Sequence, residues 1–372
     1  MSQPAVIFGG PSPEHDISIL TGLLASRALG SVHCLYWAKT GDWFEVEPGL
    51  EGRDFVDGVP KRSRPLRLVA GPGGGFFETG GPLRKDRSVD ISAAVVCCHG
   101  APGEDGTLQA ALDLAGVPYT GPTVASAALG MDKLAFGAVI VACDLPSLPR
   151  ALASEAPSWT PPFPGPYIVK PRFGGSSIGI EVATDAPAIR ALMRNSVHLR
   201  AGAVVEPFRP DAVEVQLAVR SHPALSLSNL LAPKRSARTT AGPAGAGFYS
   251  YAEKYVPGEG MHAAQGEIDP SLPDGVADAL RHAAGVVAEV AGLRGVARVD
   301  FLVDGPDWYV NEINTIPGSL AKHLWVDPAV GIDDLLAGLL DEADSRPTTC
   351  WSTAGADGTA LRSAGDIQGK LG

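Results

Sequence analysis

The residues with the clearest chemical potential lie in the run ARVDFLVDGPDWYVNEINT at 297–315. Two apolar strands joined by a DGPD turn predict a hairpin, and side chains two positions apart share one face of a strand. Arg298 therefore shares a face with Asp300. Glu312 shares a face with Asn314, and Asp300 lies opposite Glu312 if the loop holds an odd number of residues. Carboxylate and amide oxygens suit Mg²⁺ shared with phosphates, whereas a solvated sheet face, the alternative, fits such apolar strands less well.

A second candidate is the run YIVKPRFGGSSIGI at 167–180. Its glycines allow backbone N–H groups to approach an anion, Ser176 and Ser177 add hydroxyl donors, and Lys170 adds a charge. The spacing of a P-loop, GxxxxGK[ST], does not occur in the sequence. The run alone favours a hairpin tip, but together with a candidate magnesium hairpin it favours a loop that covers phosphate.

Three further residues stand in unusual surroundings. Lys133 ends the triplet MDK inside a helix-like run, and Lys254 lies in YAEKY, within a Gly/Ala/Pro-rich loop that could act as a lid. Glu206 ends the strand-like run AVVEPF at a proline-containing bend. Ordinary surface lysines and an interdomain hinge are the plainer interpretations.

Two strand-to-helix turns complete the candidates. GGPSPEHDIS places Glu14 near the start of a helix, where the helix dipole favours an acid. HGAPGEDG begins at His99, at the C-terminal end of a strand, where open α/β sheets tend to place ligand sites. A glutamate at a helix start is usually structural, so these turns gain meaning only from the other segments.

The elements that must position these residues alternate between strand and helix in the N-terminal third. Buried-strand runs at 5–10 and 93–100 are combined with helical patterns at 15–29 and 106–116. This alternation predicts a parallel sheet covered by helices. Residues 41–90 are rich in Gly and Pro and predict hairpins and loops.

The chain of 372 residues exceeds what one hydrophobic core usually supports, so several domains are expected. An apolar-periodic run at 123–144 leads into residues 146–166, whose prolines exclude regular structure and mark a join. We predict an N-terminal α/β domain, a central domain, a C-terminal domain that carries the metal site, and a tail whose order the sequence does not define: 1–122, 123–212, 213–345 and 346–372.

Composition restricts the classes of function. The formal net charge is −11, and no Lys/Arg-rich tract supplies the cationic surface that nucleic acids or anionic membranes require. The apolar runs are far shorter than the ~20 residues of a membrane helix, and no signal peptide is recognised. Five cysteines without a CxxC pair argue against a disulfide framework or a zinc knuckle. We expect a cytoplasmic protein without nucleic acid or membrane as partner, and a homodimer is left open.

Taken together, these segments resemble the D-alanine:D-alanine ligases of the ATP-grasp superfamily. The matching stretches run from residue 6 to about 318: VIFGGPSPEHDIS, HGAPGEDGTLQ with VPYTG, MDK, YIVKPRFGGSSIGI, YAEKY, and ARVDFLV with NEINTIPG. The resemblance implies an α/β (α+β), three-domain ATP-grasp fold with an N-terminal parallel-sheet domain. It also implies an ADP-forming ligase that joins small amino acids through an acyl phosphate, with D-Ala-D-Ala, a peptidoglycan precursor, as the default product.

The resemblance implies that ATP lies between the second and third domains. Residues implied to bind it are Lys133, Lys170, Ser176, Ser177, Glu206, Phe208, Arg209, Glu214 and Lys254. Of these, Lys254 would contact the transferred phosphate, Glu206 and the bend after it the adenine, and Glu214 the ribose. Two Mg²⁺ ions, which Mn²⁺ could replace, would be held by three side chains: Asp300, Glu312 and Asn314.

For the first amino acid, the resemblance makes Glu14 the partner of the ammonium group, in a network with Ser176 and Tyr255 that locks the lid. His99 would lie beside this amino acid. Arg298 and the backbone at Gly318 would stabilise the developing oxyanion.

One departure concerns the second amino acid. These ligases usually carry a serine five residues past the glycine of ExNTxPG, followed by Leu or Arg, and this serine binds the carboxylate. Here His323 occupies the serine position and Leu324 follows it. A pocket built by histidine is expected to titrate between about pH 6 and 8. A relative that joins other amino acids in specialised metabolism is therefore the enzyme alternative, and a non-catalytic nucleotide-binding protein is the other.

Overall fold

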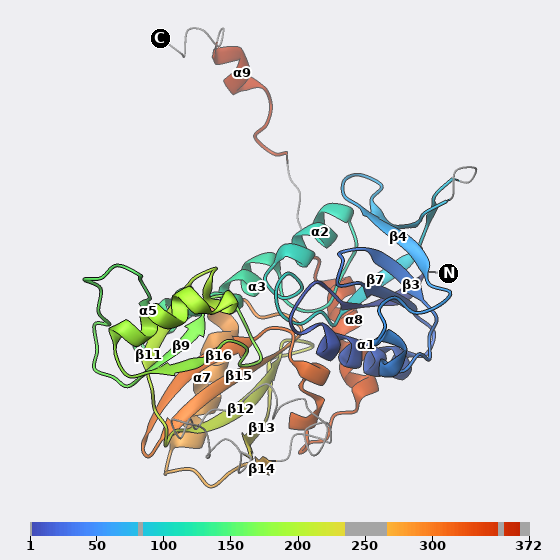
Figure 1. The fold of residues 1–372 in the computed structure, drawn as a ribbon. Coiled ribbons are helices and arrows are strands. Elements are labelled where there is room, and N and C mark those ends of the chain that lie inside the picture. Colours follow the sequence, from blue (N-terminus) through green and yellow to red (C-terminus); the bar gives the residue numbers. More distant parts are fainter. Residues whose placement is uncertain (1, 81–84, 235–265, 349–352, 365–372) are drawn as a thin grey trace.

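The structure is a computed structural model that describes residues 2–80, 85–234, 266–348 and 353–364 (Figure 1). Within these residues the strands form sheets of seven, four and five strands. The predicted lid motif YAEKY, with Lys254 and Tyr255, lies outside the described residues.

The N-terminal sheet is mixed, with strand order β6-β5-β4-β3-β2-β1-β7. Strand β1 pairs in parallel with β2 and β7, and the remaining pairs are antiparallel. The strands are β1 (Gln3–Gly9), β2 (His33–Trp37), β3 (Trp43–Val46), β4 (Arg64–Val69), β5 (Gly75–Glu78), β6 (Arg87–Ser88) and β7 (Ile91–Val96). The parallel centre agrees with the predicted sheet, and the antiparallel extension coincides with the Gly/Pro-rich residues predicted to form hairpins.

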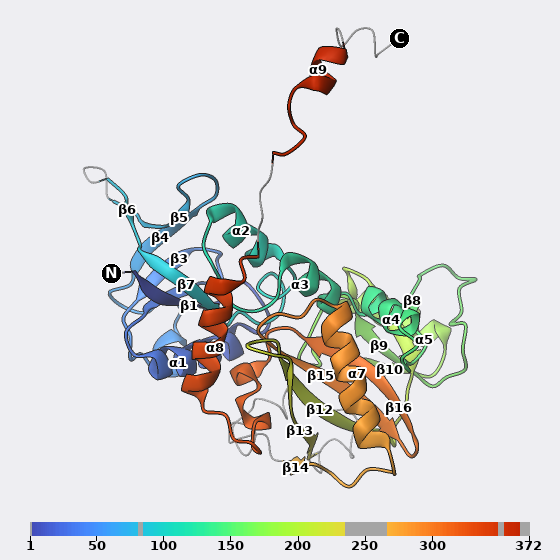
Figure 2. The ribbon, with the colours of Figure 1, turned by 180° about the vertical axis from the view of Figure 1, so that it is seen from behind.

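Strand β1 is apolar throughout because both of its faces are covered. Val6 and Phe8 belong to a core shared with helices α1 (His15–Leu29) and α8 (Ile332–Ser345), whereas Ala5 and Ile7 face α2 (Thr107–Ala115). Figure 2 shows α8, from the far end of the chain, beside α1 on the N-terminal sheet. A short 3-10 helix, η1 (Gly52–Phe55), closes the same core.

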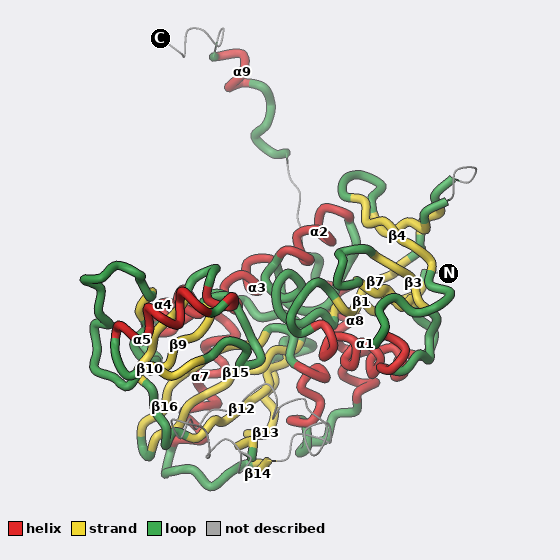
Figure 3. The backbone as a smooth tube through the Cα atoms, in the orientation of Figure 1, coloured by secondary structure: helices red, strands yellow, loops and turns green. Residues whose placement is uncertain are grey.

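The central sheet is antiparallel, with order β10-β9-β11-β8. Its elements are β8 (Ala151–Leu152), β9 (Tyr167–Pro171), β10 (Glu181–Ala183), β11 (Ala203–Pro207), α5 (Ala186–Asn195) and η2 (Val197–Leu199). The side chain of Asp185 accepts a hydrogen bond from Ala188 N and starts α5, which buries Ile189 against the sheet. Residues 146–166 form loop apart from the two residues of β8, as the prolines predict (Figure 3).

The apolar run at 123–144 forms two helices, α3 (Val124–Met131) and α4 (Lys133–Ala142), rather than one. The break lies at Asp132, whose carboxylate accepts hydrogen bonds from the amides of Leu134 and Ala135 and thereby caps α4. Arg172 holds the same carboxylate in a bidentate pair. The break makes Lys133 the first residue of a helix.

The C-terminal sheet has the order β14-β13-β12-β15-β16, with α7 packed on one face. Its elements are β12 (Val213–Arg220), β13 (Ser226–Pro233), β14 (Gly266–Ile268), α7 (Val276–Val290), β15 (Val296–Asp304) and β16 (Asp307–Asn314). The chain continues through the 3-10 segment η4 (Gly318–Leu324) to α8, and then to α9 (Thr359–Ser363), which both ribbon views draw away from the other elements.

The strands of each sheet lie within one of the ranges 1–122, 123–212 and 213–345, but α8 packs on the first sheet. We therefore keep these boundaries as a proposal. In the described part of the chain, no helix combines the length and apolar character needed to cross a membrane.

Candidate functional site

The hairpin of β15 and β16 brings the predicted metal-binding side chains together. Asp300 pairs with Glu312, and Arg298 pairs with Asn314. We predicted that an odd number of loop residues would place Asp300 opposite Glu312. The turn between the paired Asp304 and Asp307 instead holds two residues, an even number. A β-bulge in β16 shifts the register by one residue and still brings Asp300 opposite Glu312. Phe301 lies opposite Val310 and Asp300 opposite Glu312, which leaves Asn311 as the extra residue of β16.

Asp300 is the buried centre of this group. Its carboxylate accepts two hydrogen bonds from Arg298, at 2.6 Å from Nε and 2.7 Å from Nη2, and one from Asn314 Nδ2 at 3.1 Å. Burial raises the pKa of Asp300 to about 6; the charges of Glu214 and Glu312 add to this rise, and Arg298 opposes it. A cation bound here would offset the repulsion among these carboxylates.

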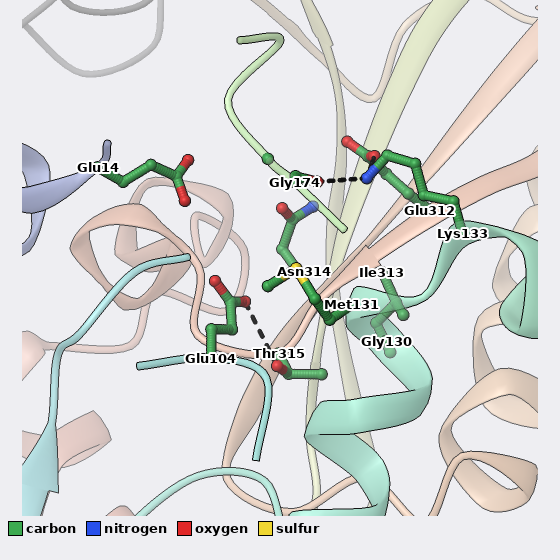
Figure 4. Close-up of a pocket in the computed structure, with 11 residues that line it drawn as sticks. Glu14, Glu104, Gly130, Met131, Lys133, Gly174, Glu312, Ile313, Asn314 and Thr315 are labelled. Atoms are coloured by element: carbon green, nitrogen blue, oxygen red, sulfur yellow. Dashed lines mark hydrogen bonds and ion pairs between the residues drawn. The ribbon is translucent and has the colours of Figure 1, made fainter. Parts of the chain in front are cut away.

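Two lysine ammonium groups lie close to the hairpin. The ammonium of Lys133, at the start of α4, is 3.2 Å from Glu312 Oε2 and donates to the carbonyl of Gly174 (Figure 4). Lys170 Nζ, from β9, donates to Glu206 Oε2 at 2.7 Å and to Asn311 Oδ1 at 3.1 Å. Two positive charges from the central sheet region thus meet the edge of the C-terminal sheet.

The predicted adenine segment begins at Glu206, which is fully buried. Burial would raise the pKa of this carboxyl, but the positive charges of Lys170 and Arg150 outweigh burial and lower the pKa below its ordinary value. Its carboxylate is therefore already engaged by these two cations. After it, Phe208 N donates to the carbonyl of Pro166 at 2.8 Å.

The other predicted nucleotide residues lie farther along the chain. The side chain of Arg209 is exposed, and Glu214 on β12 accepts a hydrogen bond from Gln216 at 2.7 Å.

The loop between β9 and β10 lies against the N-terminal domain. A Cβ atom at Gly175 would lie 3.2 Å from both carboxylate oxygens of Glu14, so a larger residue would require the Glu14 side chain to shift slightly. Ser176 and Ser177 follow in the left-handed region, with φ of 50° and 59°. The loop is a hairpin connection by topology, since β9 and β10 are antiparallel, and it also faces Glu14.

One cavity collects these groups (Figure 4). It encloses about 340 Å³ of space, part of which is open to solvent. Its lining comes from loops beside the N-terminal and central sheets, from helices α3 and α4, and from the end of β16: Glu14, Glu104, Gly130, Met131, Lys133, Gly174, Gly175, Glu312, Ile313, Asn314 and Thr315. Acidic and basic side chains both reach this space, and its use as the ATP site that the resemblance implies stays a prediction.

Comparison with known proteins places the chain among the ligases that it resembles. Residues 3–122 match the profile described as D-ala D-ala ligase N-terminus, and residues 160–341 match D-ala D-ala ligase C-terminus. A D-alanine--D-alanine ligase of Chlorobaculum tepidum is 32% identical over 365 residues, a match that covers 90% of this chain and 95% of that protein. The chain belongs to the D-alanine--D-alanine ligase family.

Solved structures of the family confirm the fold. The D-alanine-D-alanine ligase of Helicobacter pylori superposes with a TM-score of 0.71 at 22% identity and covers 94% of this chain and 100% of its own. The VanG D-Ala:D-Ser ligase of Enterococcus faecalis gives a TM-score of 0.71 at 21% identity, with 92% and 99% covered. The predicted ATP-grasp fold of this ligase family is therefore confirmed.

Glu104 lines the cavity and was missed as a functional candidate. Its carboxylate accepts hydrogen bonds from Ile316 N at 2.8 Å, Thr315 Oγ1 at 3.3 Å and Gly100 N at 3.1 Å. Burial and the charge of Glu14 raise the pKa of Glu104 to about 7. The turn HGAPGEDG contained the signal, an acid after a strand end. Asn311 was missed although it begins the stretch NEINTIPG, and Arg150 was missed because no motif marks it.

His99 lies beside the cavity with both ring nitrogens in use. Nδ1 lies 2.7 Å from the carbonyl of Ile316, which can only accept, so Nδ1 carries the proton. Nε2 then accepts from Thr21 Oγ1 at 2.9 Å, and this oxygen accepts from Ser319 N at 3.1 Å. Burial lowers the pKa of His99 to about 4. The neutral ring thus joins α1, β7 and η4, and its predicted contact with an amino acid stays a prediction.

The segment predicted to bind the second amino acid is η4, which starts at Gly318. Burial, with the charges of Arg298 and Lys322, lowers the pKa of His323 to about 4. The expectation of titration between pH 6 and 8 is therefore wrong, and the ring is neutral at physiological pH. The side chain of Leu324 is fully buried in the N-terminal core, which leaves its backbone as the part that could meet a ligand.

Proposed function

We propose that this ligase-family protein joins two D-alanine molecules with ATP, forming ADP and phosphate. The observation that carries the proposal is a cavity that Glu14, Lys133 and Glu312 line together with Gly174 and Gly175 of the glycine-serine loop. In this proposal the acid binds an ammonium group, the lysine binds phosphate and the second carboxylate binds a metal ion, and all three line one space. The names of the relatives support D-alanine as the amino acid.

The donor set fits magnesium. Asp300, Glu312 and Asn314 offer hard oxygen atoms from adjacent strands, and a bound cation would favour the charged form of Asp300, whose pKa is raised chiefly by burial. Among the described residues, no group of three His, Cys, Asp or Glu side chains forms a complete metal cage. Bound Mg²⁺ supplies charge neutralisation for phosphoryl transfer, and Mn²⁺ has similar ligand preferences.

The proposed ligation proceeds in two steps, phosphorylation of the first amino acid and then formation of the peptide bond. An oxygen of the first carboxylate forms a bond to the γ-phosphorus as the bridging P–O bond of ATP breaks, which releases ADP. The amine of the second amino acid then attacks the acyl carbon, the C–O bond to phosphate breaks, and the amine loses its proton. In this scheme Lys133 and Lys170 neutralise phosphate charge, while Glu14 orients the first ammonium.

The remaining roles complete this scheme. Arg298 and the amide region of Gly318 stabilise the tetrahedral oxyanion, while Ser176 and Tyr255 lock the lid over the acyl phosphate. Lys254 contacts the transferred phosphate. Tyr255 and Lys254 lie outside the described residues, so their roles rest on the family resemblance alone.

A ligase for a different second amino acid is the alternative, and His323 favours it. A neutral imidazole offers one donor in a larger group than a serine hydroxyl, so the pocket accommodates a different side chain. One structural relative is a D-Ala:D-Ser ligase by its title, so the family fold is compatible with another second substrate.

An ATPase assay over single and paired D- and L-amino acids tests the proposal. We expect phosphate release with D-alanine alone and a product with the mass of the dipeptide. Turnover only with another pair would support the specialised ligase. ATP binding without turnover on any pair would support the non-catalytic alternative and contradict the proposal.

We further propose that the protein works in the cytoplasm, where it supplies dipeptide for the cell wall. Light scattering of the purified protein measures whether it forms a homodimer.

A further inference from the structure

The side chain of Arg150 connects three elements of the site and has no role in the scheme above. It lies just before β8, in the proline-rich segment, and is 4% exposed. Nη1 donates to the carbonyl of Lys133, and Nη2 donates to the carbonyl of Asn311. Nε lies 3.2 Å from Glu206 Oε1, an ion pair without the alignment of a hydrogen bond. One guanidinium therefore joins α4, the bulge of β16 and β11.

Each of these contacts leads to a phosphate-binding lysine. Lys133 carries one of the two ammonium groups itself. The other, on Lys170, is held by Glu206 Oε2 and Asn311 Oδ1, which belong to the two other residues that Arg150 contacts. Both ammonium groups are thus linked to the same guanidinium through these contacts.

Charge gives Arg150 a second effect. The connected group holds three cations, Arg150, Lys133 and Lys170, against the carboxylates of Glu206 and Glu312. Without Arg150, the buried Glu206 would have Lys170 as its remaining close cation and would hold that ammonium more tightly. Less positive charge would then remain for a phosphate.

The interior of α4 is shaped around this arginine. A Cβ atom at Gly137 would lie 2.6 Å from Arg150 Cδ, so the glycine leaves room for the arginine stem to cross the helix. Glycine in a helix interior costs stability, and this contact gives a reason for it here.

We propose that Arg150 is a positioning residue that sets the place and the effective charge of both phosphate-binding lysines. The inference rests on the proposed function in one respect, that Lys133 and Lys170 bind the phosphates of ATP. It predicts that Arg150 affects phosphate binding without touching the nucleotide.

Equilibrium binding of ATP and of adenosine to the whole protein tests this without turnover. For Arg150→Met we expect the Kd for ATP to rise about tenfold or more, because a buried charge loses its partner. The Kd for adenosine, which lacks phosphate, should rise much less than the Kd for ATP, since Arg150 is linked to both lysines but meets the predicted adenine segment only at Glu206. Arg190→Met is the matched control, because Arg190 also donates to a backbone carbonyl of the central domain, that of Trp159, but contacts neither lysine.

Two milder variants keep the test decisive if Arg150→Met does not fold. Arg150→Lys keeps the charge but cannot reach three elements with one ammonium, and Gly137→Ala displaces the stem while the arginine remains. Both should weaken ATP more than adenosine, with an intermediate effect. An unchanged ratio of the two Kd values in every folded variant, or an equal loss for both ligands, would overturn the inference.

Results that contradict the proposed ligase activity can be distinguished from results that contradict the role of Arg150. Wild-type protein that binds ATP more tightly than adenosine but ligates no amino acids would contradict the ligase activity, and the binding comparison would still decide the role of Arg150. Wild-type protein that binds both ligands equally would overturn the inference, because the lysines then bind no phosphate.

Discussion

The two ends of the candidate site are built in different ways. At the metal end, Asp300 and Glu312 project from a regular antiparallel ladder, whose register places them opposite each other. At the second-substrate end, η4 contains three successive non-glycine residues, Ser319, Leu320 and Ala321, in the left-handed region with φ near 50°. Such a conformation costs roughly 1–2 kcal/mol for each residue.

The metal end and the second-substrate end are stabilised by different interactions. The ladder is stabilised by its own backbone hydrogen bonds, so a polar side chain on it can change without loss of the strand. The strained segment depends on other elements, since Ser319 N donates to Thr21 and Leu320 is buried in the N-terminal core. We therefore expect substitutions in the hairpin to alter chemistry alone, and substitutions around η4 to alter stability as well.

The largest effect is expected for Glu312→Gln. One negative charge fewer at a site for two metal ions should lower kcat by roughly three orders of magnitude, with the melting temperature almost unchanged. The exposed Asp307→Asn, at the tip of the same hairpin, is the control and should retain activity. Magnesium-dependent activity of Glu312→Gln within tenfold of wild type would disprove its role.

A somewhat smaller loss of catalytic efficiency is expected for Arg298→Lys. Lysine keeps the charge but not the bidentate pair with Asp300, and we expect kcat/KM to fall about 100-fold in a folded protein. Arg281→Lys, at a pair with Asp269 that is partly exposed, provides the comparison. Equal kinetics for the two variants would mean that the forked geometry of Arg298 is unimportant.

The buried His99, which lies beside η4, should make the free energy of unfolding decrease at acidic pH. Burial lowers the pKa of His99 from 6.5 to about 4, so between these values the unfolded chain binds a proton that the folded protein does not. Stability should therefore fall as pH decreases through this window, with a contribution of about 1.4 kcal/mol per pH unit. Above pH 6.5 the contribution vanishes, since both states are neutral.

Urea denaturation of His99→Gln between pH 4 and 8 measures this term. The variant should be less stable at neutral pH because of lost hydrogen bonds, but its stability should depend less steeply on pH below 6.5. The exposed His282→Gln should retain the wild-type slope. The same slope in His99→Gln as in wild type would show that His99 titrates normally.

The smallest effect is expected at the exposed Ser319. Ser319→Gly removes left-handed strain but loosens the unfolded chain, so we expect a net gain in stability of about 0.5 kcal/mol. Ser319→Ala keeps the strain and should not show the gain. If glycine is no more stabilising than alanine in thermal denaturation, η4 is not strained in solution and the contrast with the hairpin is weaker than proposed.

Local patterns predicted much of the fold but not every boundary. The helix over 15–29 and the buried strands around it follow from apolar spacing, and the structure has α1 over His15–Leu29. The apolar spacing at 123–144 continues without interruption and does not indicate where one helix ends and the next begins. Asp132 separates the two helices by capping α4 with its carboxylate, which the distant Arg172 also binds.

In the candidate site, too, some features follow from the local sequence and others from the tertiary structure. That Arg298 shares a face with Asp300, and Glu312 with Asn314, was determined by the sequence itself, because side chains alternate along a strand with a period of two. The opposition of Asp300 and Glu312 was decided by a bulge at Asn311 that no local pattern announces. Lys170, Glu206 and Arg150 meet only because the central and C-terminal sheets pack together, and Arg150 donates to a carbonyl 161 residues away. Such contacts depend on tertiary structure, since their partners are distant in sequence and nothing in the residues between them specifies the distance.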